Sequence, residues 1–254
     1  MFRAIAVFLV VTSLGLAAGP AFAQDFSDSS EPDANAWWVQ HATEESAEKK
    51  FHLLPDNSEM PRDWLGLARD TGFLFAYQVA VVGILSALPS SISNWNGHNK
   101  DISFEKWWDN VQHPHWDHDS WTINYIGHPY FGATYYIRAR ERGMDRIDSF
   151  LYAAFASALY EFGVEAFFEK PSYQDLIVTP IGGALLGGFV FEPLRSWVTN
   201  KPELKWYDHV IQIGTDPIGA LNYVTESLLG IKSNIRVGVP RGGGVFVELR
   251  MPLN

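Results

Sequence analysis

The stretch Ser149–Gly188 reads SFLYAAFASALYEFGVEAFFEKPSYQDLIVTPIGGALLGG. Two apolar runs with helical spacing meet at the Lys-Pro-Ser sequence of residues 170–172, where proline ends the first helix because it lacks a backbone donor. The first run contains Glu161 and Glu165, which share one helix face because they are four residues apart. An apolar helix that carries two neighbouring carboxylates predicts a polar site inside a helical domain.

The second run begins with a capping sequence and continues into a face of small residues. Ser172 and Asp175 form Ser-x-x-Asp, a variant of the capping box, which gives Asp175 a local structural role. Pro180 predicts a kink. Gly183 and Gly187 are four residues apart, and such a face lets two helices approach closely. We therefore expect this helix to pack tightly against a neighbour.

A long apolar helix is predicted upstream, over Asp63–Leu88. Asp63 can cap its start, and Pro89 follows its end. From Phe73 onward the run is apolar except for Tyr77, Gln78 and Ser86. A helix that is apolar all round lies at the centre of a bundle or contacts a membrane. The apolar part is shorter than the roughly 20 residues that a span needs, so we expect the bundle centre.

A further helix is expected to start at His128-Pro129, because proline is well tolerated in the first turn. Its end is marked by Gly143 and by a basic last turn that suits the helix dipole. The basic residues are Arg138, Arg140 and Arg142.

The composition of the 254-residue chain fits a folded protein with a large apolar core. Hydrophobic residues make up 47% of the chain, which excludes global disorder. The formal net charge is -10, so no basic surface for nucleic acid is expected and nucleic acid is not a predicted partner. The chain has no Cys, which excludes disulfides, thiol catalysis and thiolate metal sites.

Residues 1–23 have the pattern of a signal peptide. Arg3 precedes an apolar run over residues 4–18, and residues 21–23 read Ala-Phe-Ala, a small-x-small cleavage pattern. The alternative is a membrane anchor helix, but the run is short. We predict an exported protein that is periplasmic or associated with the outer membrane, with a flexible acidic segment over residues 24–60.

Residues 233–254 change character and predict a β-hairpin. Apolar residues alternate on both sides of a glycine-rich turn at residues 241–244. An isolated hairpin is marginally stable, so it should lie on the helical domain of residues 61–232 or add a strand to an outer-membrane protein partner. The predicted fold class is mainly α: a compact bundle of four to six apolar helices with a C-terminal β-hairpin.

His128, Glu161 and Glu165 are the candidate catalytic residues, and the same three are the candidate metal ligands. If the helices pack in sequence order, these side chains converge. One possible role for this cluster is a ligand pocket without chemistry. In a second, structural role the glutamates pair with Arg138, Arg140 or tyrosines. The two remaining roles are that the cluster binds a divalent ion or that one glutamate acts as general acid or base. A cofactor remains unknown.

Tyr135, Arg138 and Asp175 are predicted to contribute to binding, because they lie at the ends or faces of neighbouring helices. A second dense group of His and Asp occupies residues 113–120, HPHWDHDS. It could ligate a metal or form a solvated loop in which Asp caps turns. The chain has no Gly-x-Ser-x-Gly, His-Glu-x-x-His or phosphate-loop motif.

Three segments resemble a known family: NYIGHPYFGATYYIRARERG at residues 124–143, YEFGVE at 160–165 and PSYQDLIVTPIGGALLGG at 171–188. They are similar to the domain of unknown function 3943 family, and this resemblance implies an exported bacterial protein without supplying a mechanism. A more distant similarity is to VanZ-like proteins of the inner membrane. That likeness implies an envelope role related to glycopeptide or lipid, and its matching positions are His128, Glu161, Glu165, Ser172, Asp175, Gly183 and Gly187.

The sequence therefore predicts an exported cell-envelope protein with a non-catalytic binding or structural role and a polar His/Glu pocket. The rival prediction is an envelope hydrolase or transferase that acts on lipid or cell-wall material, with or without a metal. A lipid or membrane surface is a predicted partner under both.

Overall fold

The computed structural model describes residues 62–93, 95, 97–116, 119–229, 234–238 and 246–250. The predicted signal peptide and the acidic segment of residues 24–60 lie outside this part of the chain. The described elements are α4 (Trp64–Ala87), α5 (Ser90–Ser93), α6 (Gly97–Lys100), α7 (Phe104–Gln112), the π turn η1 (Ile123–Gly127), α8 (His128–Glu141), α9 (Arg146–Ala158), the π turn η2 (Leu159–Val164), the 3₁₀ turn η3 (Glu165–Phe167), α10 (Asp175–Leu186), the π turn η4 (Gly187–Phe191), α11 (Glu192–Thr199), α12 (Trp206–Thr215), α13 (Pro217–Leu228), β1 (Asn234–Gly238) and β2 (Phe246–Arg250).

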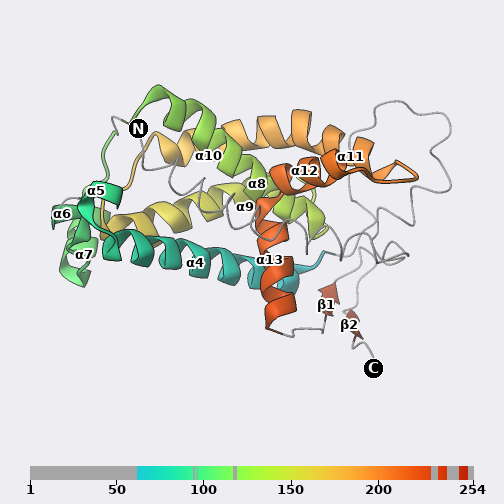
Figure 1. Ribbon diagram of the computed structural model, residues 1–254, viewed down its shortest axis with the longest axis horizontal. Coiled ribbons are helices and arrows are strands. Elements are labelled where there is room, and N and C mark those ends of the chain that lie inside the picture. Colours follow the sequence, from blue (N-terminus) through green and yellow to red (C-terminus); the bar gives the residue numbers. More distant parts are fainter. Residues whose placement is uncertain are drawn as a thin grey trace.

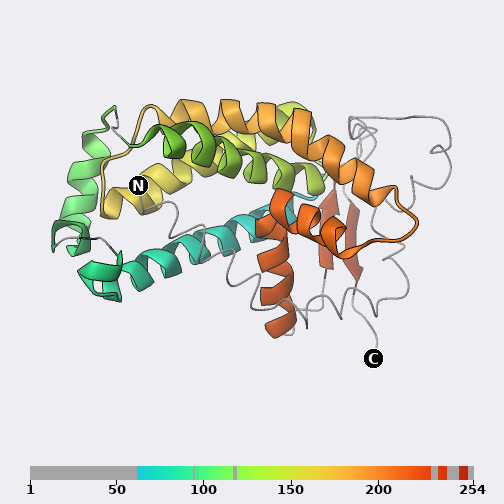
Figure 2. The same cartoon turned by 45° about the horizontal axis from the view of Figure 1, so that its top comes forward.

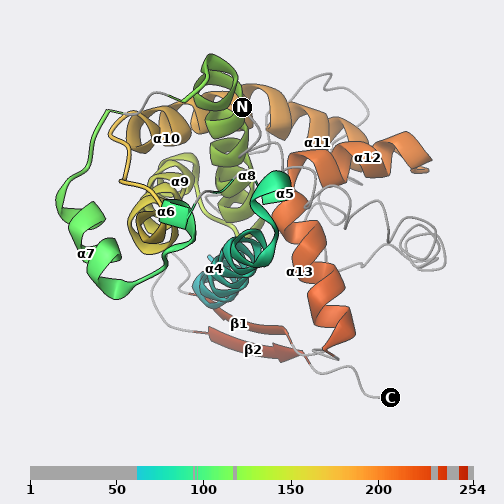
Figure 3. The ribbon, with the colours of Figure 1, turned by 60° about the vertical axis from the view of Figure 1, so that its left-hand side comes forward.

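Four long segments, α4, α8, α9 and α10, build the body of the molecule (Figure 1). Helices α4 and α10 run along the long axis at opposite edges, and α8 and α9 lie between them (Figure 1). Helix α7 closes one end, and α12 and α13 pack at the other (Figures 2 and 3). The main core lies between α4, α8 and α9 and includes Leu74, Ile137 and Ala153.

The predicted fold class needs correction. The described residues contain ten α-helices rather than four to six, because short helices α5 to α7 and the terminal pair α12 and α13 surround the four long segments. Within the described part of residues 62–229 the fold is entirely helical, without a strand. The strands of the described residues lie outside this range, at residues 234–238 and 246–250.

Two five-residue strands follow the helices. Strands β1 and β2 pair antiparallel, with Val237 opposite Val247, and β1 lies beside α4. The glycine-rich turn predicted at residues 241–244 lies outside the described residues. The contact of this region with an outer-membrane protein stays a prediction.

Helix α4 begins as expected but lies elsewhere than expected. The Asp63 side chain accepts a hydrogen bond from the Gly66 backbone at 2.8 Å, which is the predicted cap. However, the predicted place at the bundle centre is wrong, since only 17% of its most apolar window is buried. Hydropathy alone could not distinguish these positions, because core and lipid favour the same side chains.

Helices α8 and α10 touch through their backbones, as the small-residue face predicts. A Cβ atom added to Gly132 would lie 1.9 Å from the Thr179 carbonyl oxygen, and one added to Gly183 would lie 2.3 Å from the Gly132 carbonyl carbon. Only glycine fits at both positions. Figure 2 shows the two helices side by side, and their contact holds one wall of the site in place.

Helix α8 begins at His128, with Pro129 in its first turn, as predicted. It continues directly from helical residues 121–127, and the His128 backbone N–H donates to the Ile123 carbonyl five residues back. This π turn accommodates Pro129, whose ring would otherwise clash with the preceding turn. His128 is therefore an interior residue of a long helix, and its side chain points from the helix wall rather than from a flexible end.

Candidate functional site

A cavity of about 180 Å³ lies between the four long segments and α13. Its wall is mostly apolar and comes from helices that are distant in sequence. The apolar lining residues are Leu74, Val81, Val82, Leu85, Trp95, Ile123, Gly127, Phe131, Phe168, Pro217, Ile218 and Leu221. The polar or aromatic-hydroxyl lining residues are Tyr77, Gln78, Asp119, His128, Thr134, Tyr135, Ser157, Tyr160, Glu161, Glu165, Glu169 and Thr179.

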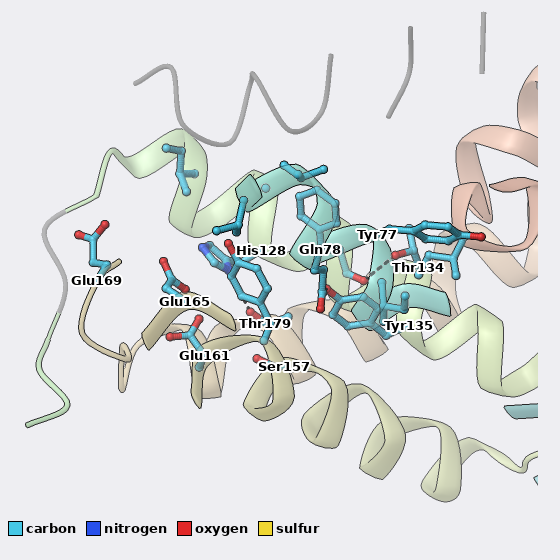
Figure 4. A pocket seen from close by; sticks show the side chains of 18 of the residues that line it. Tyr77, Gln78, His128, Thr134, Tyr135, Ser157, Glu161, Glu165, Glu169 and Thr179 are labelled. Atoms are coloured by element: carbon cyan, nitrogen blue, oxygen red, sulfur yellow. Dashed lines mark hydrogen bonds between the residues drawn. The ribbon is translucent and has the colours of Figure 1, made fainter. Parts of the chain in front are cut away.

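The polar groups are not spread evenly around the cavity. His128, Glu161, Glu165 and Thr179 gather at one end, with Ser157 near them, while Gln78 and Tyr135 lie toward the other (Figure 4). Of the described residues that line the cavity, none is Lys or Arg. The cavity therefore combines an apolar wall with a carboxyl-rich end whose described lining contains His128 but no Lys or Arg.

Glu161 and Glu165 form the centre of the carboxyl-rich end. Glu161 lies in the π turn η2 and is 1% exposed. It accepts a hydrogen bond from the Ser172 backbone at 2.8 Å, which ties η2 to the break before α10. Glu165 lies in the following turn and interacts with Glu161, and burial together with the charge of Glu161 raises the pKa of Glu165. Two carboxyl groups that share a buried site favour a shared proton.

The environment of Glu165 favours a proton on this pair. Burial, and next the negative charge of Glu161, raise the pKa of Glu165 well above its usual value, and Glu169 and Asp175 act in the same direction. Two ionised carboxylates this close in a desolvated site repel each other, so one stays neutral. Glu165 is thus a carboxylic acid that can donate a hydrogen bond or a proton.

His128 bridges the site to α10 through both ring nitrogens. Nδ1 lies 3.1 Å from the Thr179 hydroxyl, and Nε2 lies 3.4 Å from Asp175 Oδ1. If Nε2 carries the proton and faces the carboxylate, Nδ1 accepts from Thr179. The close approach of α8 and α10 at Gly132 and Gly183 makes this geometry possible.

Of the residues predicted to bind, Tyr135 and Asp175 belong to the site region and Arg138 does not. Tyr135 lines the cavity, and its hydroxyl accepts a weak 3.5 Å hydrogen bond from Gln78. Asp175 is buried behind His128, and its backbone N–H donates to Ser172 Oγ at 3.2 Å. Only this half of the predicted capping box is formed, because the Ser172 backbone N–H donates to Glu161.

Arg138 instead belongs to an arginine cluster near the C-terminal end of α8. Its Nη1 lies 3.1 Å from Asp216 and its Nε 3.5 Å from Asp70. Arg140 pairs with buried Glu192, at 2.5 Å. The hypothesis that these two arginines neutralise the glutamate pair is therefore wrong: they pair with acids that are far away in the sequence.

Sequence reasoning missed several lining residues, chiefly Gln78 and Thr179. Gln78 was visible as a polar exception in an apolar helix, and this signal would have pointed to a polar surface on α4. Thr179 had no such signal, because threonine is common on helices. Its role follows from the position of α10 against α8.

A metal centre finds no support among the described residues. No three His, Asp or Glu side chains in the part of the chain that the structure describes lie so that they could hold a metal ion. In the HPHWDHDS segment, His115 forms a backbone bridge with Ser172, and the predicted cluster residues Asp117 and His118 lie outside the described residues. We therefore assign no step to a metal.

Residues 113–218 match the family model of a domain of unknown function, DUF3943. The resemblance predicted from the three sequence segments is confirmed over this range. The DUF3943 match contains His128, Glu161, Glu165, Asp175 and Thr179, whereas the cavity wall on α4 lies outside it. No curated protein and no solved structure matches the chain, and the similarity to VanZ-like proteins stays a prediction.

Proposed function

We propose that this chain is an exported cell-envelope protein that binds an amphiphilic molecule in its cavity. The observation that carries the proposal is the division of the cavity into an apolar wall and a carboxyl-rich end. The hydrocarbon part of the ligand lies along residues such as Leu74, Val82 and Phe131. Its polar head meets Glu165, Glu161 and His128.

The lining predicts which head groups bind. Glu165 donates a hydrogen bond, while the Glu161 carboxylate accepts one. An anionic head would meet acids without a compensating lysine or arginine in the lining, and burying such a charge is costly. Hydroxyl and amine heads are therefore favoured over carboxylate.

The size of the cavity also limits the ligand. Its volume of about 180 Å³ is below the roughly 300–1,000 Å³ of pockets that enclose drug-sized ligands. One hydrocarbon chain fits such a space better than a whole two-chain lipid. We therefore assign a single chain with its head to this site.

The test compares ligands of one chain length on the purified protein. Dodecanol, dodecylamine and dodecanoate are titrated by isothermal calorimetry. Dodecanoate should bind at least about tenfold weaker than the other two, because burying its poorly compensated carboxylate costs more than about 1.4 kcal/mol of binding free energy. Val82→Trp should block binding by filling the cavity. Its matched control on the same helix is Val79→Trp, which is exposed and does not line the cavity. Equal binding of all three ligands, or no effect of V82W, would contradict the proposal.

The second candidate is a hydrolase or transferase, and the neutral Glu165 beside Glu161 favours it. A carboxyl group with a raised pKa is a suitable general acid near neutral pH. The probe is para-nitrophenyl dodecanoate, which carries the same chain as the binding ligands. Turnover that is lost in Glu165→Gln to a much greater extent than dodecanol affinity would favour this ester-cleaving enzyme. Absence of turnover by the unsubstituted protein would eliminate it.

A further inference from the structure

Helix α4 is long and apolar enough to cross a membrane, yet most of it lies at the protein surface. Its 24 residues extend about 36 Å at 1.5 Å per residue, compared with about 30 Å for the hydrocarbon core of a bilayer. Only 17% of its most apolar window is buried. A core helix of a soluble protein would be mostly buried, so α4 does not have that role.

A second such helix runs without interruption through α10, η4 and α11, from Asp175 to Thr199. It has 25 residues, and 33% of its most apolar window is buried. Its buried side packs on α8 through the glycine contacts described above. Its opposite side carries an exposed apolar stripe with a spacing of four residues, formed by Ile177, Ile181, Leu185 and Phe189.

Helix α9 extends this exposed apolar surface. Ile147, Leu151 and Phe155 are also four residues apart, and each is more than half exposed. Helix α9 packs against α10, so the two exposed rows lie on adjacent helices. Soluble monomers rarely expose contiguous apolar patches larger than a few hundred Å².

The ionisable residues within the second long helix are turned away from this surface. Glu192 is fully buried and bonded to Arg140 and Tyr136, and Arg195 is bonded to Glu141 at 2.6 Å. Inward, paired charges are the pattern of helices in lipid. Exposed Trp64 opens α4 and exposed Trp197 closes α11, as expected of residues at a membrane interface.

We propose that α4 and the continuous helix α10–η4–α11 cross the hydrocarbon region of a lipid bilayer, with the apolar stripe in contact with acyl chains. A water-exposed stripe, a soluble partner and a second copy of the chain are the competing occupants. None of them requires a helix of bilayer length or paired inward charges.

The absence of Cys from the chain makes single-cysteine labelling a direct test. Ile181→Cys and Leu185→Cys place a thiol on the stripe, while Lys170→Cys and Glu203→Cys place one at exposed positions beyond either end of the helix. Each full-length variant is treated with a bulky membrane-impermeant maleimide, first in isolated open membranes and then after denaturing detergent. Ile137→Cys, at a fully buried position, reports in mild detergent whether the fold is retained.

The expected result is labelling of the 170 and 203 variants in open membranes and of the 181 and 185 variants only after denaturation. In sealed spheroplasts, one of the two end positions should be labelled and the other protected. Labelling of the stripe at the rate of the end positions, or release of the protein by alkaline carbonate, would overturn the proposal. Labelling of both ends in sealed spheroplasts would overturn the crossing, and disulfide-linked dimers through position 181 would assign the stripe to a second copy.

Discussion

The two ends of α8 hold buried acids in opposite ways. Near its C-terminal end, the arginine cluster neutralises each acid with a guanidinium: Arg142 binds Asp70 at 2.7 and 2.8 Å and Asp63 at 3.0 Å. Near its N-terminal end, the lining of the cavity contains carboxyls without Lys or Arg, and the pKa of Glu165 is raised by burial and by the charge of Glu161. Buried acids with fixed cationic partners hold helices together. Acids that share a proton remain able to exchange it or to meet a ligand.

The largest effect is expected from breaking the arginine cluster at Asp70. Asp70 is fully buried and also accepts from Asn222 at 3.0 Å. Asp70→Asn keeps the shape but leaves Arg142 without its main partner, so the free energy of unfolding should fall by about 3–5 kcal/mol. Chemical denaturation of the purified protein measures this loss.

The same measurement on Glu161→Gln supplies the contrast with Asp70→Asn. The amide oxygen of the substituted side chain can still accept from the Ser172 backbone, so the loss should be about 1 kcal/mol. If the two substitutions cost the same, the distinction between the two kinds of buried acid is wrong.

The next largest loss of stability is expected from disturbing the backbone contact between α8 and α10, which holds one wall of the cavity in place. Gly183→Ala places a methyl group 2.3 Å from a backbone carbon of Gly132, and because backbone cannot move aside cheaply, the cost should lie near about 3 kcal/mol. Gly83→Ala on α4 is the matched control, since open space surrounds it and alanine favours a helix by about 0.5–1 kcal/mol. Thermal unfolding of both variants checks the prediction. Equal effects would show that α8 and α10 are not in backbone contact.

The third prediction concerns the pH dependence that the shared proton creates. Because the pKa of Glu165 is raised in the folded state, the native protein binds more protons than the unfolded chain above pH about 4.5. Its stability should therefore fall as pH rises, by up to about 1.4 kcal/mol per pH unit, until the raised pKa is passed.

Glu165→Gln should lack this loss, so the stabilities of the two proteins should diverge from about pH 5 upward. Denaturation curves from about pH 4 to 8 measure the difference, with Glu105→Gln as an exposed control. Parallel pH profiles for the unsubstituted protein and E165Q would mean that Glu165 is ionised in the native state.

Local sequence rules predicted the parts of the site that depend on neighbours along the chain. The spacing of Glu161 and Glu165 predicted their shared face, Ser172 and Asp175 predicted a cap, and Gly183 predicted a close helix contact. These features depend on the chemistry of about one helical turn. Their geometry was therefore available from the sequence.

Features that depend on distant partners could not be predicted in this way. Arg138 is separated from Asp70 and Asp216 by many residues, so its helix gave no sign that it pairs with these acids rather than with the glutamates. The position of α4 at the edge of the helical body could not be predicted, because an apolar helix suits both a protein core and a bilayer. The π turn before His128 depends on tertiary packing, which spacing rules for regular helices do not contain.

The smallest expected effect is at Thr179, and it tests whether the carboxyl-rich end acts as a site. Thr179→Val removes the hydroxyl that bonds His128 Nδ1 while keeping a branched side chain, so the loss of stability should be about 1 kcal/mol. Thr179→Ser retains the hydroxyl and should be closer to the unsubstituted protein. Because His128 lines the cavity, T179V should weaken dodecanol binding. The arginine cluster does not line the cavity, so Asp70→Asn should leave dodecanol affinity unchanged at a temperature where this variant is folded. A T179V protein that loses stability but keeps full affinity would show that His128, like Arg138, serves the fold alone.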